Sequence, residues 1–265
     1  MRSEKWSELT EHRWPFKNHR EVDEACRRTA ARMEHEGFED LVAFFASLVA
    51  RYAQWTWNLP ASERHHHAFP FGLIIHGAET VERAVAVGGG TLRAFAPEWH
   101  KATVAFALYH DCGRVFDVEM TDASGRVWDP LQQSLLQFCR SGPTSFRWRP
   151  GRGLVGHEYR SQRLFPHLLP DQWVAEVRKP LDDAWYAYFH RSRLPLDFLG
   201  VYPYCVAGIV SWADQRSAQA DRLRRKMAAR AVPEAGADAP VCYYLPKTPT
   251  RTPVHRTGPS IGGDR

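Results

Sequence analysis

The sequence predicts an all-α protein, a helical bundle with one small β-hairpin inserted in it. Apolar residues recur at helical spacing along most of the chain, whereas one short stretch alone combines extended residues with a polar turn. The chain has 265 residues, of which 44% are hydrophobic and 25% charged, so it can bury one sizeable core. We expect one helical domain over residues 1–230, with its core at about 40–220, and a flexible basic tail over 231–265.

Eight segments have the spacing expected of helices. They are residues 21–36, 39–57, 72–87, 98–110, 130–140, 158–169, 181–189 and 203–230. Stop signals follow three of them: Gly37, Pro60 and the glycine triplet 88–90. The hairpin is expected where residues 115–120 and 126–128 flank the polar turn 122–125.

Several classes of protein are excluded by composition. No run of eighteen apolar residues occurs, and the first twenty residues are too charged for a secretory signal, so we expect a cytoplasmic protein without membrane insertion. The five cysteines are scattered without C-x-x-C spacing, which argues against a disulfide framework or a zinc ribbon.

Positive charge is unevenly distributed, although the net charge is only +5. Between Gln137 and Arg163 six arginines accompany one acid, Glu158, together with Phe146, Trp148 and Tyr159. Arginines interleaved with aromatic residues suit a phosphate backbone and stacked bases. A solvated basic face is the alternative interpretation for each single arginine.

A histidine and an aspartate stand side by side at the end of a very apolar predicted helix, as His110 and Asp111. Burial of an ionised carboxylate costs several kcal/mol unless a cation or strong hydrogen bonds compensate. His76, on the preceding helix, and Asp214, after an apolar run on a later one, complete a mixed nitrogen and oxygen ligand set. The pattern predicts a divalent metal held by these four residues.

The order of these residues resembles the HD superfamily, in which a histidine is followed by a His-Asp doublet and a distant aspartate. The chain is most similar to the amino-terminal HD-type domain of conjugative relaxases of the TraI/MobH type. Further landmarks in register are Leu59-Pro60-Ala61-Ser62, His65-His66-His67, Pro70-Phe71-Gly72-Leu73, Gly113, Trp128-Asp129-Pro130-Leu131, Arg152, His157-Glu158 and Ala213 to Ser217. Phe71 departs from the pattern because the family usually has a second glycine there, and Arg114 replaces a common lysine.

The resemblance implies an HD-domain bundle with metal-dependent phosphohydrolase activity on DNA, of the kind used in conjugative transfer. Asp111 would hold the metal and orient water, while Arg114 and Arg152 would stabilise phosphate charge. His157 is expected near the site as a further ligand, a proton donor or a phosphate contact. The resemblance also places the run His65, His66 and His67 at the mouth of the site.

Three functions remain open at this point. The leading one is cleavage of DNA, expected to be single-stranded, with other conjugation proteins as partners. The second is a nucleotide phosphohydrolase with the same metal in a closed pocket, and the third is a non-catalytic DNA-binding component of a transfer machine. The ligand set suits Mn, Fe, Zn or Mg and does not identify the metal.

Overall fold

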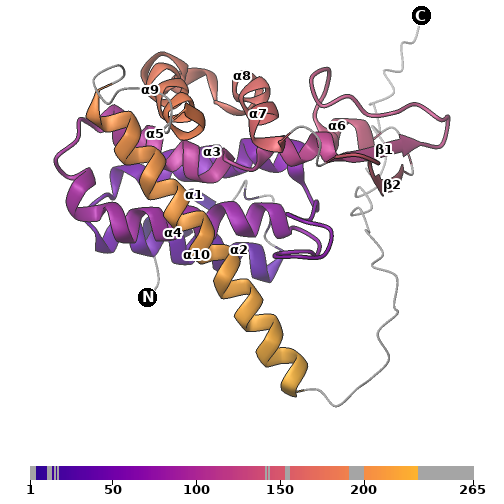
Figure 1. Cartoon of the computed structure of the whole chain (residues 1–265), viewed down its shortest axis with the longest axis horizontal. Helices are drawn as coiled ribbons and strands as arrows, with labels where there is room; N and C mark the ends of the chain where they lie inside the picture. The colour runs from indigo at the N-terminus through magenta and orange to yellow at the C-terminus, as the bar shows by residue number, and fades with distance from the viewer. Residues whose placement is uncertain are drawn as a thin grey trace, which may run out of the picture.

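The computed structural model is a bundle of helices with a two-stranded sheet at one end (Figure 1). It describes residues 4–10, 14, 16, 18–140, 142, 144–152, 156–190 and 200–231. The elements in chain order are α1 (Glu4–Thr10), α2 (Arg20–His35), α3 (Asp40–Thr56), α4 (Gly72–Leu92), α5 (Pro97–Tyr109), η1 (Cys112–Asp117), β1 (Val118–Asp122), α6 (Leu135–Cys139), β2 (Thr144–Trp148), α7 (His157–Ser161), η2 (Gln162–Leu164), α8 (Phe165–Leu168), α9 (Asp171–His190) and α10 (Val201–Ala231). The predicted fold class is confirmed.

Helix α4 lies at the centre of the bundle, where it packs against α2, α5 and α10. Helix α5 in turn contacts α3 and α9, so α4 and α5 are covered on several sides. The apolar stripe of α3 is buried as predicted, with Leu41, Phe44, Phe45 and Leu48 each no more than 1% exposed. This packing brings the amino-terminal end of α4 and the carboxyl-terminal end of α5 together beside the middle of α10.

The sheet differs from the predicted hairpin in its second strand. The polar turn forms as expected, with Gly125 at φ +82° and its N–H donating to the carbonyl of Asp122 at 3.0 Å. Strand β1, however, pairs antiparallel with β2. In the described part of the chain, the segment 126–128 contributes an isolated bridge, between Val127 and Thr121. Residues 115–117 belong to the 3₁₀ helix η1.

Helix α4 does not end at the glycine triplet, which corrects the sequence prediction. It continues to Leu92 because the glycines fit a close contact: a Cβ on Gly88 would lie 3.2 Å from Ile209 of α10, and one on Gly89 would lie 2.8 Å from Glu36. Packing here outweighs the roughly 1 kcal/mol that each glycine costs in a helix. The predicted helix 130–140 shortens to α6, and 158–169 divides into α7, η2 and α8.

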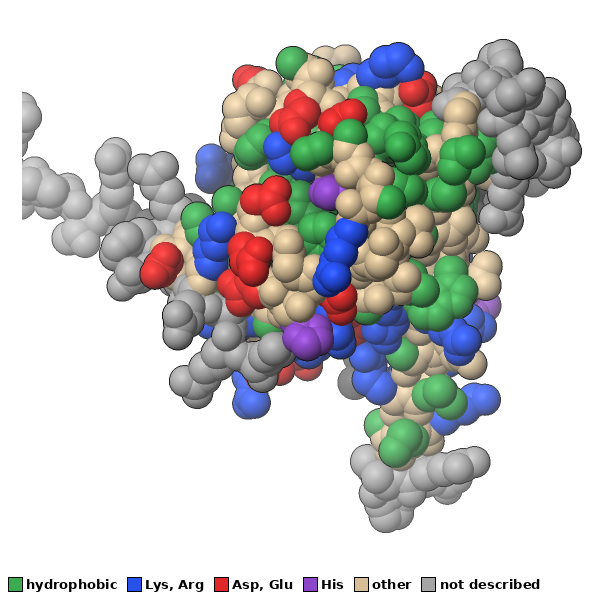
Figure 2. All heavy atoms as spheres, turned by 90° about the vertical axis from the view of Figure 1, so that its left-hand side faces the viewer, with side chains coloured by type: hydrophobic (Ala, Val, Ile, Leu, Met, Phe, Trp, Pro, Cys, Tyr) green, Lys and Arg blue, Asp and Glu red, His purple; other side chains and the backbone are tan. Residues whose placement is uncertain are grey.

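Helix α10 crosses the bundle, and its carboxyl-terminal part extends beyond the body (Figure 1). Figure 2 shows basic and apolar side chains on this extension, where Leu223 is 54% and Met227 70% exposed. In the described part of the chain, no helix combines the length and apolarity that crossing a bilayer requires. The tail predicted over 231–265 lies outside the described residues from 232 onward.

Candidate metal centre

The four predicted ligand residues come together from three parts of the bundle. His76 lies in the second turn of α4, His110 and Asp111 connect α5 to η1, and Asp214 lies on α10. The Nε2 atom of His76 lies 3.1 Å from Oδ1 of Asp214 and 3.9 Å from Oδ2 of Asp111. The Nε2 atom of His110 lies 3.5 Å from the same oxygen of Asp214. Two imidazoles and two carboxylates therefore face one another.

Both imidazoles present a buried nitrogen that faces the carboxylates but makes no hydrogen bond of acceptable geometry with any residue that the structure describes. These atoms are Nε2 of His76 and Nε2 of His110. The other nitrogen of His110, Nδ1, lies 2.8 Å from the carbonyl oxygen of Ala107, which can only accept. Nδ1 must carry a proton, so Nε2, which faces the carboxylates, is the position that either a second proton or a metal ion would occupy. The ligand atoms of His76, His110 and Asp111 lie within 4.8 Å of one another, as metal ligands do.

The carboxylates make this centre electronegative. Burial raises the pKa of Asp111, but His157, His110 and Arg114 together hold that pKa well below its ordinary value. Burial raises the pKa of Asp214, but the neighbouring His110 and His76 together lower it by more than burial raises it. The pKa of Asp214 therefore also lies below its ordinary value. Burial lowers the pKa of His110, yet the two carboxylates outweigh burial and raise that pKa to about 9. The ionised pair attracts a cation, either a proton or a metal.

His157 is attached to the centre through Asp111. Its Nε2 atom lies 2.7 Å from Oδ1 of Asp111. The hydroxyl of Ser161 accepts from the N–H of Gly113 at 2.7 Å and lies 3.1 Å from the carbonyl oxygen of His110. A Cβ on Gly113 would lie 1.8 Å from the carbonyl oxygen of His157, so only glycine allows α7 to approach this closely.

A cleft of about 910 Å³ borders the centre. Its lining includes Asp214 and His157 and four arginines: Arg64, Arg114, Arg152 and Arg222. The guanidinium of Arg152 lies over the ring of Trp148 at 5.2 Å and pairs with Glu63. Arg114 lies 3.6 Å from Asp111 and 3.4 Å from Asp117. Both arginines that were expected to meet phosphate thus border the cleft, each already beside an acid.

Of the arginines in the basic stretch, only Arg152 is among the described residues that line this cleft. Arg147 pairs with Glu119 across the sheet at 2.5 Å, and Arg149 donates to the carbonyl of Val118 at 2.9 Å. Arg160 pairs with Asp117. The interleaved pattern arises in part because β2 is a strand, whose alternate residues point to opposite faces.

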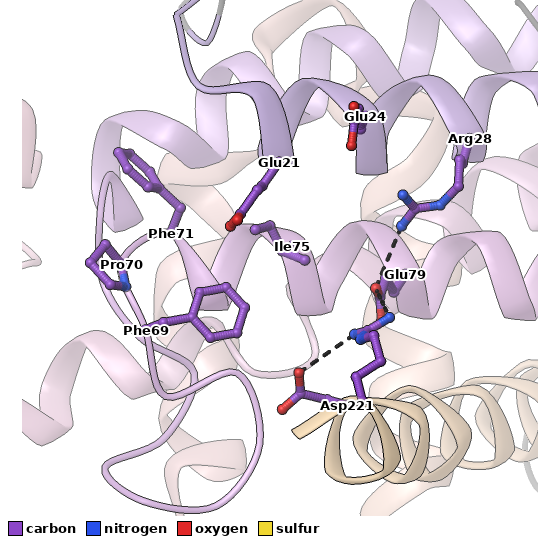
Figure 3. Close-up of a pocket in the computed structure, with 10 residues that line it drawn as sticks. Glu21, Glu24, Arg28, Phe69, Pro70, Phe71, Ile75, Glu79 and Asp221 are labelled. Carbon is purple, nitrogen blue, oxygen red and sulfur yellow. Dashed lines mark hydrogen bonds and ion pairs between the residues drawn. The ribbon is translucent and has the colours of Figure 1, made fainter. Parts of the chain in front are cut away.

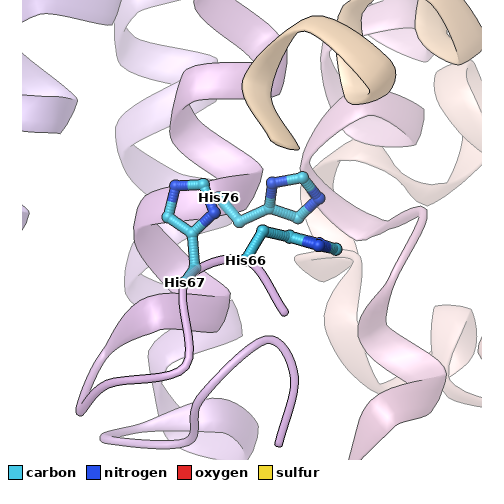
Figure 4. A group of neighbouring side chains, drawn as sticks. All are labelled: His66, His67 and His76. Carbon is cyan, nitrogen blue, oxygen red and sulfur yellow. The ribbon is translucent and has the colours of Figure 1, made fainter. Parts of the chain in front are cut away.

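His66 and His67 lie beside His76 (Figure 4), and the three histidines of the run 65–67 have different environments. His65 is exposed and lines the cleft. The ring of His66 lies 4.8 Å from that of His76, and burial with the nearby His76 lowers its pKa to about 3, so it is a neutral ring. His67 is fully buried at φ +47°, and its Nε2 atom lies 3.3 Å from Glu79. The ligand atoms of His66, His67 and His76 form a second cluster within 4.8 Å.

The sequence prediction missed the residues behind His76. Glu79 is 2% exposed and Ser217 is fully buried, and the two are joined by a hydrogen bond of 3.1 Å. Each stands three residues after a candidate ligand, Glu79 after His76 and Ser217 after Asp214, and therefore lies on the same helix face. Glu79, an acid one turn after His76 on the largely apolar helix α4, was the signal that could have identified this pair.

One family model matches residues 26–239 of the chain, that of TraI_2, described as "Putative helicase". No curated protein and no solved structure matches the chain. The matched residues make up most of the sequence. They include all four candidate ligands, His157, and the arginines Arg114 and Arg152 of the cleft. The chain therefore belongs to the TraI_2 family and is a TraI-like domain of the kind linked to conjugative transfer.

Proposed function

We propose that this chain is an HD-type, metal-dependent phosphohydrolase domain that acts on DNA in conjugative transfer. The observation that carries the proposal is the convergence of His76, His110, Asp111 and Asp214 around two buried, unpartnered imidazole nitrogens. Without a cation, two ionised carboxylates beside these nitrogens would be a costly arrangement to bury. The four residues fit a mixed site for Mn, Fe, Zn or Mg.

In this proposal His76, His110, Asp111 and Asp214 would hold the divalent ion, which would supply Lewis-acid polarisation of a phosphoryl oxygen and lower the pKa of water. Asp111 has two tasks, because one of its oxygens accepts from His157 while the other lies near His76. His157 borders the cleft, and its hydrogen bond to Asp111 holds its ring in place as a candidate proton donor or phosphate contact. Arg114 and Arg152 stabilise the negative charge that develops on the phosphate.

Single-stranded DNA is the proposed substrate. The cleft brings together an aromatic ring, Trp148, and a guanidinium, Arg152, which lies over that ring, and such pairs of aromatic and cationic groups suit single-stranded nucleic acid. Membership of the TraI_2 family supports nucleic acid over a free nucleotide. We do not propose ATP-driven strand separation for this chain, since a P-loop requires a Gly-Lys pair and none occurs in its 265 residues.

Elemental analysis of the purified protein, followed by cleavage assays on a single-stranded oligonucleotide and on nucleoside triphosphates, tests the proposal. We expect bound divalent metal, cleavage of the oligonucleotide, and loss of both in Asp111→Ala. Asp171→Ala is the matched control, because Asp171 is an exposed residue at the start of α9. Protein that folds without metal and cleaves neither substrate contradicts the proposal. Cleavage of nucleoside triphosphates alone supports the nucleotide phosphohydrolase instead.

A further inference from the structure

Three buried side chains form a continuous line behind the metal centre. The Nδ1 atom of His76 lies 3.1 Å from the hydroxyl oxygen of Ser217. That hydroxyl donates in turn to Oε2 of Glu79, also at 3.1 Å. His76 and Ser217 are fully buried and Glu79 is 2% exposed, so the line is protected from water. It reaches His76 from the side opposite the nitrogen that faces Asp214.

The direction of these hydrogen bonds determines the tautomer of His76. A carboxylate only accepts, so the single hydroxyl proton of Ser217 is used by Glu79. The hydroxyl oxygen must then accept from His76, which requires the imidazole proton on Nδ1. Nε2 keeps its lone pair: it lies 3.1 Å from Asp214, but within the described residues it makes no hydrogen bond of acceptable geometry. If both hydrogen bonds ran in the opposite direction, Ser217 would donate to Nδ1 of His76 and the ring proton would lie on Nε2, where a metal would bind.

Glu79 is itself held by cations from two other helices (Figure 3). Arg224 of α10 donates to both of its oxygens, at 2.9 and 3.2 Å, and Arg28 of α2 lies 3.5 Å away. Arg224 also lies 3.5 Å from Asp221. These residues line a cavity of about 580 Å³, distinct from the cleft that contains Asp214. Burial raises the pKa of Glu79, but His67, whose Nε2 atom lies 3.3 Å from the carboxylate, and Arg224 together hold that pKa well below its ordinary value.

We propose that Glu79 and Ser217 are positioning residues that set the tautomer and orientation of His76 for metal binding. The inference rests on the proposed metal site, but the tautomer that it requires is a property of the metal-free protein as well. Outer partners of this kind commonly change metal affinity by about 10- to 100-fold when they are removed.

The variants Glu79→Gln and Ser217→Ala test the proposal, with Glu82→Gln as the matched control. Glu82 lies one turn further along α4 and pairs with Arg28 at 3.7 Å, so its change removes a similar charge away from Ser217. The glutamine in Glu79→Gln can donate to Ser217, whose hydroxyl can then donate to His76. Nitrogen-15 NMR of the imidazoles in metal-free protein measures the tautomer, and titration with Mn²⁺, with the free ion counted by electron paramagnetic resonance, measures the affinity.

We expect the Nδ1–H tautomer at His76 in the wild type and in Glu82→Gln, with Mn²⁺ affinity unchanged in that control. Glu79→Gln and Ser217→Ala should each weaken Mn²⁺ binding about 10- to 100-fold and populate the Nε2–H tautomer. If Glu79→Gln does not fold, Ser217→Ala decides alone, because it removes one hydroxyl and no charge. Wild-type protein with Nε2–H at His76, or a folded Ser217→Ala with wild-type affinity and tautomer, overturns the inference. Wild-type protein that keeps Nδ1–H but takes up no Mn²⁺ supports the positioning line and contradicts the metal site.

Discussion

Replacement of Gly113 by alanine should separate α7 from the candidate metal centre. Gly113 is not among the residues with positive φ, so alanine fits the backbone and the perturbation is steric. Its Cβ would lie 1.8 Å from the carbonyl oxygen of His157 and 2.8 Å from the hydroxyl of Ser161. Normal van der Waals contact is about 3.5 Å, so α7 must move by roughly 1.5 Å.

The size of the effect follows from the contacts that this movement breaks. They are the 2.7 Å hydrogen bond from the Gly113 N–H to Ser161 and the 2.7 Å contact between His157 and Asp111. Overpacking of a buried site and loss of a charge-assisted hydrogen bond each cost about 1–3 kcal/mol. We expect the free energy of unfolding to fall by about 2–4 kcal/mol and hydrolysis to slow about 100-fold, since a displacement of about 1 Å can have that effect.

Urea unfolding followed by circular dichroism measures the first quantity, and oligonucleotide cleavage measures the second. Gly90→Ala is the matched control, because a Cβ at Gly90 meets nothing within 4 Å and the residue lies inside α4. Alanine there should stabilise the protein by about 0.5–1 kcal/mol. A Gly113→Ala protein within about 0.5 kcal/mol of the wild type, with its cleavage rate intact, would refute the close approach of α7.

Three further predictions concern charge, backbone strain and DNA. The pKa of His110 is raised from 6.5 to about 9, so its contribution to stability in metal-free protein should be complete below pH 6.5 and lost as pH rises through 9, as urea unfolding at each pH would show. Phe71 lies at φ +64°, where a Cβ costs about 1–2 kcal/mol, so Phe71→Gly should destabilise the protein less than Phe71→Ala by about that amount. Arg152→Ala should reduce the salt dependence of single-stranded DNA binding by about one phosphate contact, measured by fluorescence anisotropy, whereas Arg147→Ala, outside the cleft, should not.

Each of these predictions has a contradicting result. Stability that rises between pH 6.5 and 9 would mean that the carboxylates do not hold a proton on His110. Equal unfolding free energies for the two Phe71 variants would show that the left-handed backbone is not strained. Equal salt dependence in the Arg152 and Arg147 variants would remove Arg152 from the DNA-binding surface.

The long helices were predictable because their apolar spacing reflects burial. The segment 39–57 became α3, with Leu41 and Phe45 in the core, and its boundaries were almost correct. The glycine triplet misled the prediction because its close contacts with Ile209 and Glu36 join segments far apart in sequence. Strand β2 was missed although its residues alternate between half-buried and exposed, since the arginines in it favoured an interpretation as a binding surface.

The candidate ligands were predictable for a different reason. The His-Asp doublet ends an apolar helix, so both residues had to be buried, and buried acids require partners. The local sequence did not show which residues from other segments would lie beside these ligands. The 2.7 Å contact of His157 with Asp111 depends on the fit of α7 against Gly113, and the location of Arg152 beside Trp148 depends on the pairing of β2 with β1. Such contacts are products of tertiary packing.

Helix α10 contributes four side chains to the candidate metal centre and to the residues that support it. Asp214 faces the imidazoles, Ser217 holds His76, Asp221 accepts from the backbone N–H of His67 at 2.8 Å, and Arg224 anchors Glu79. With 3.6 residues per turn these four positions follow one side of a rigid rod. Because the four side chains share one helix, a displacement of α10 would change their positions together, and the candidate ligand, its supporting hydroxyl and the anchor of Glu79 would shift as a set.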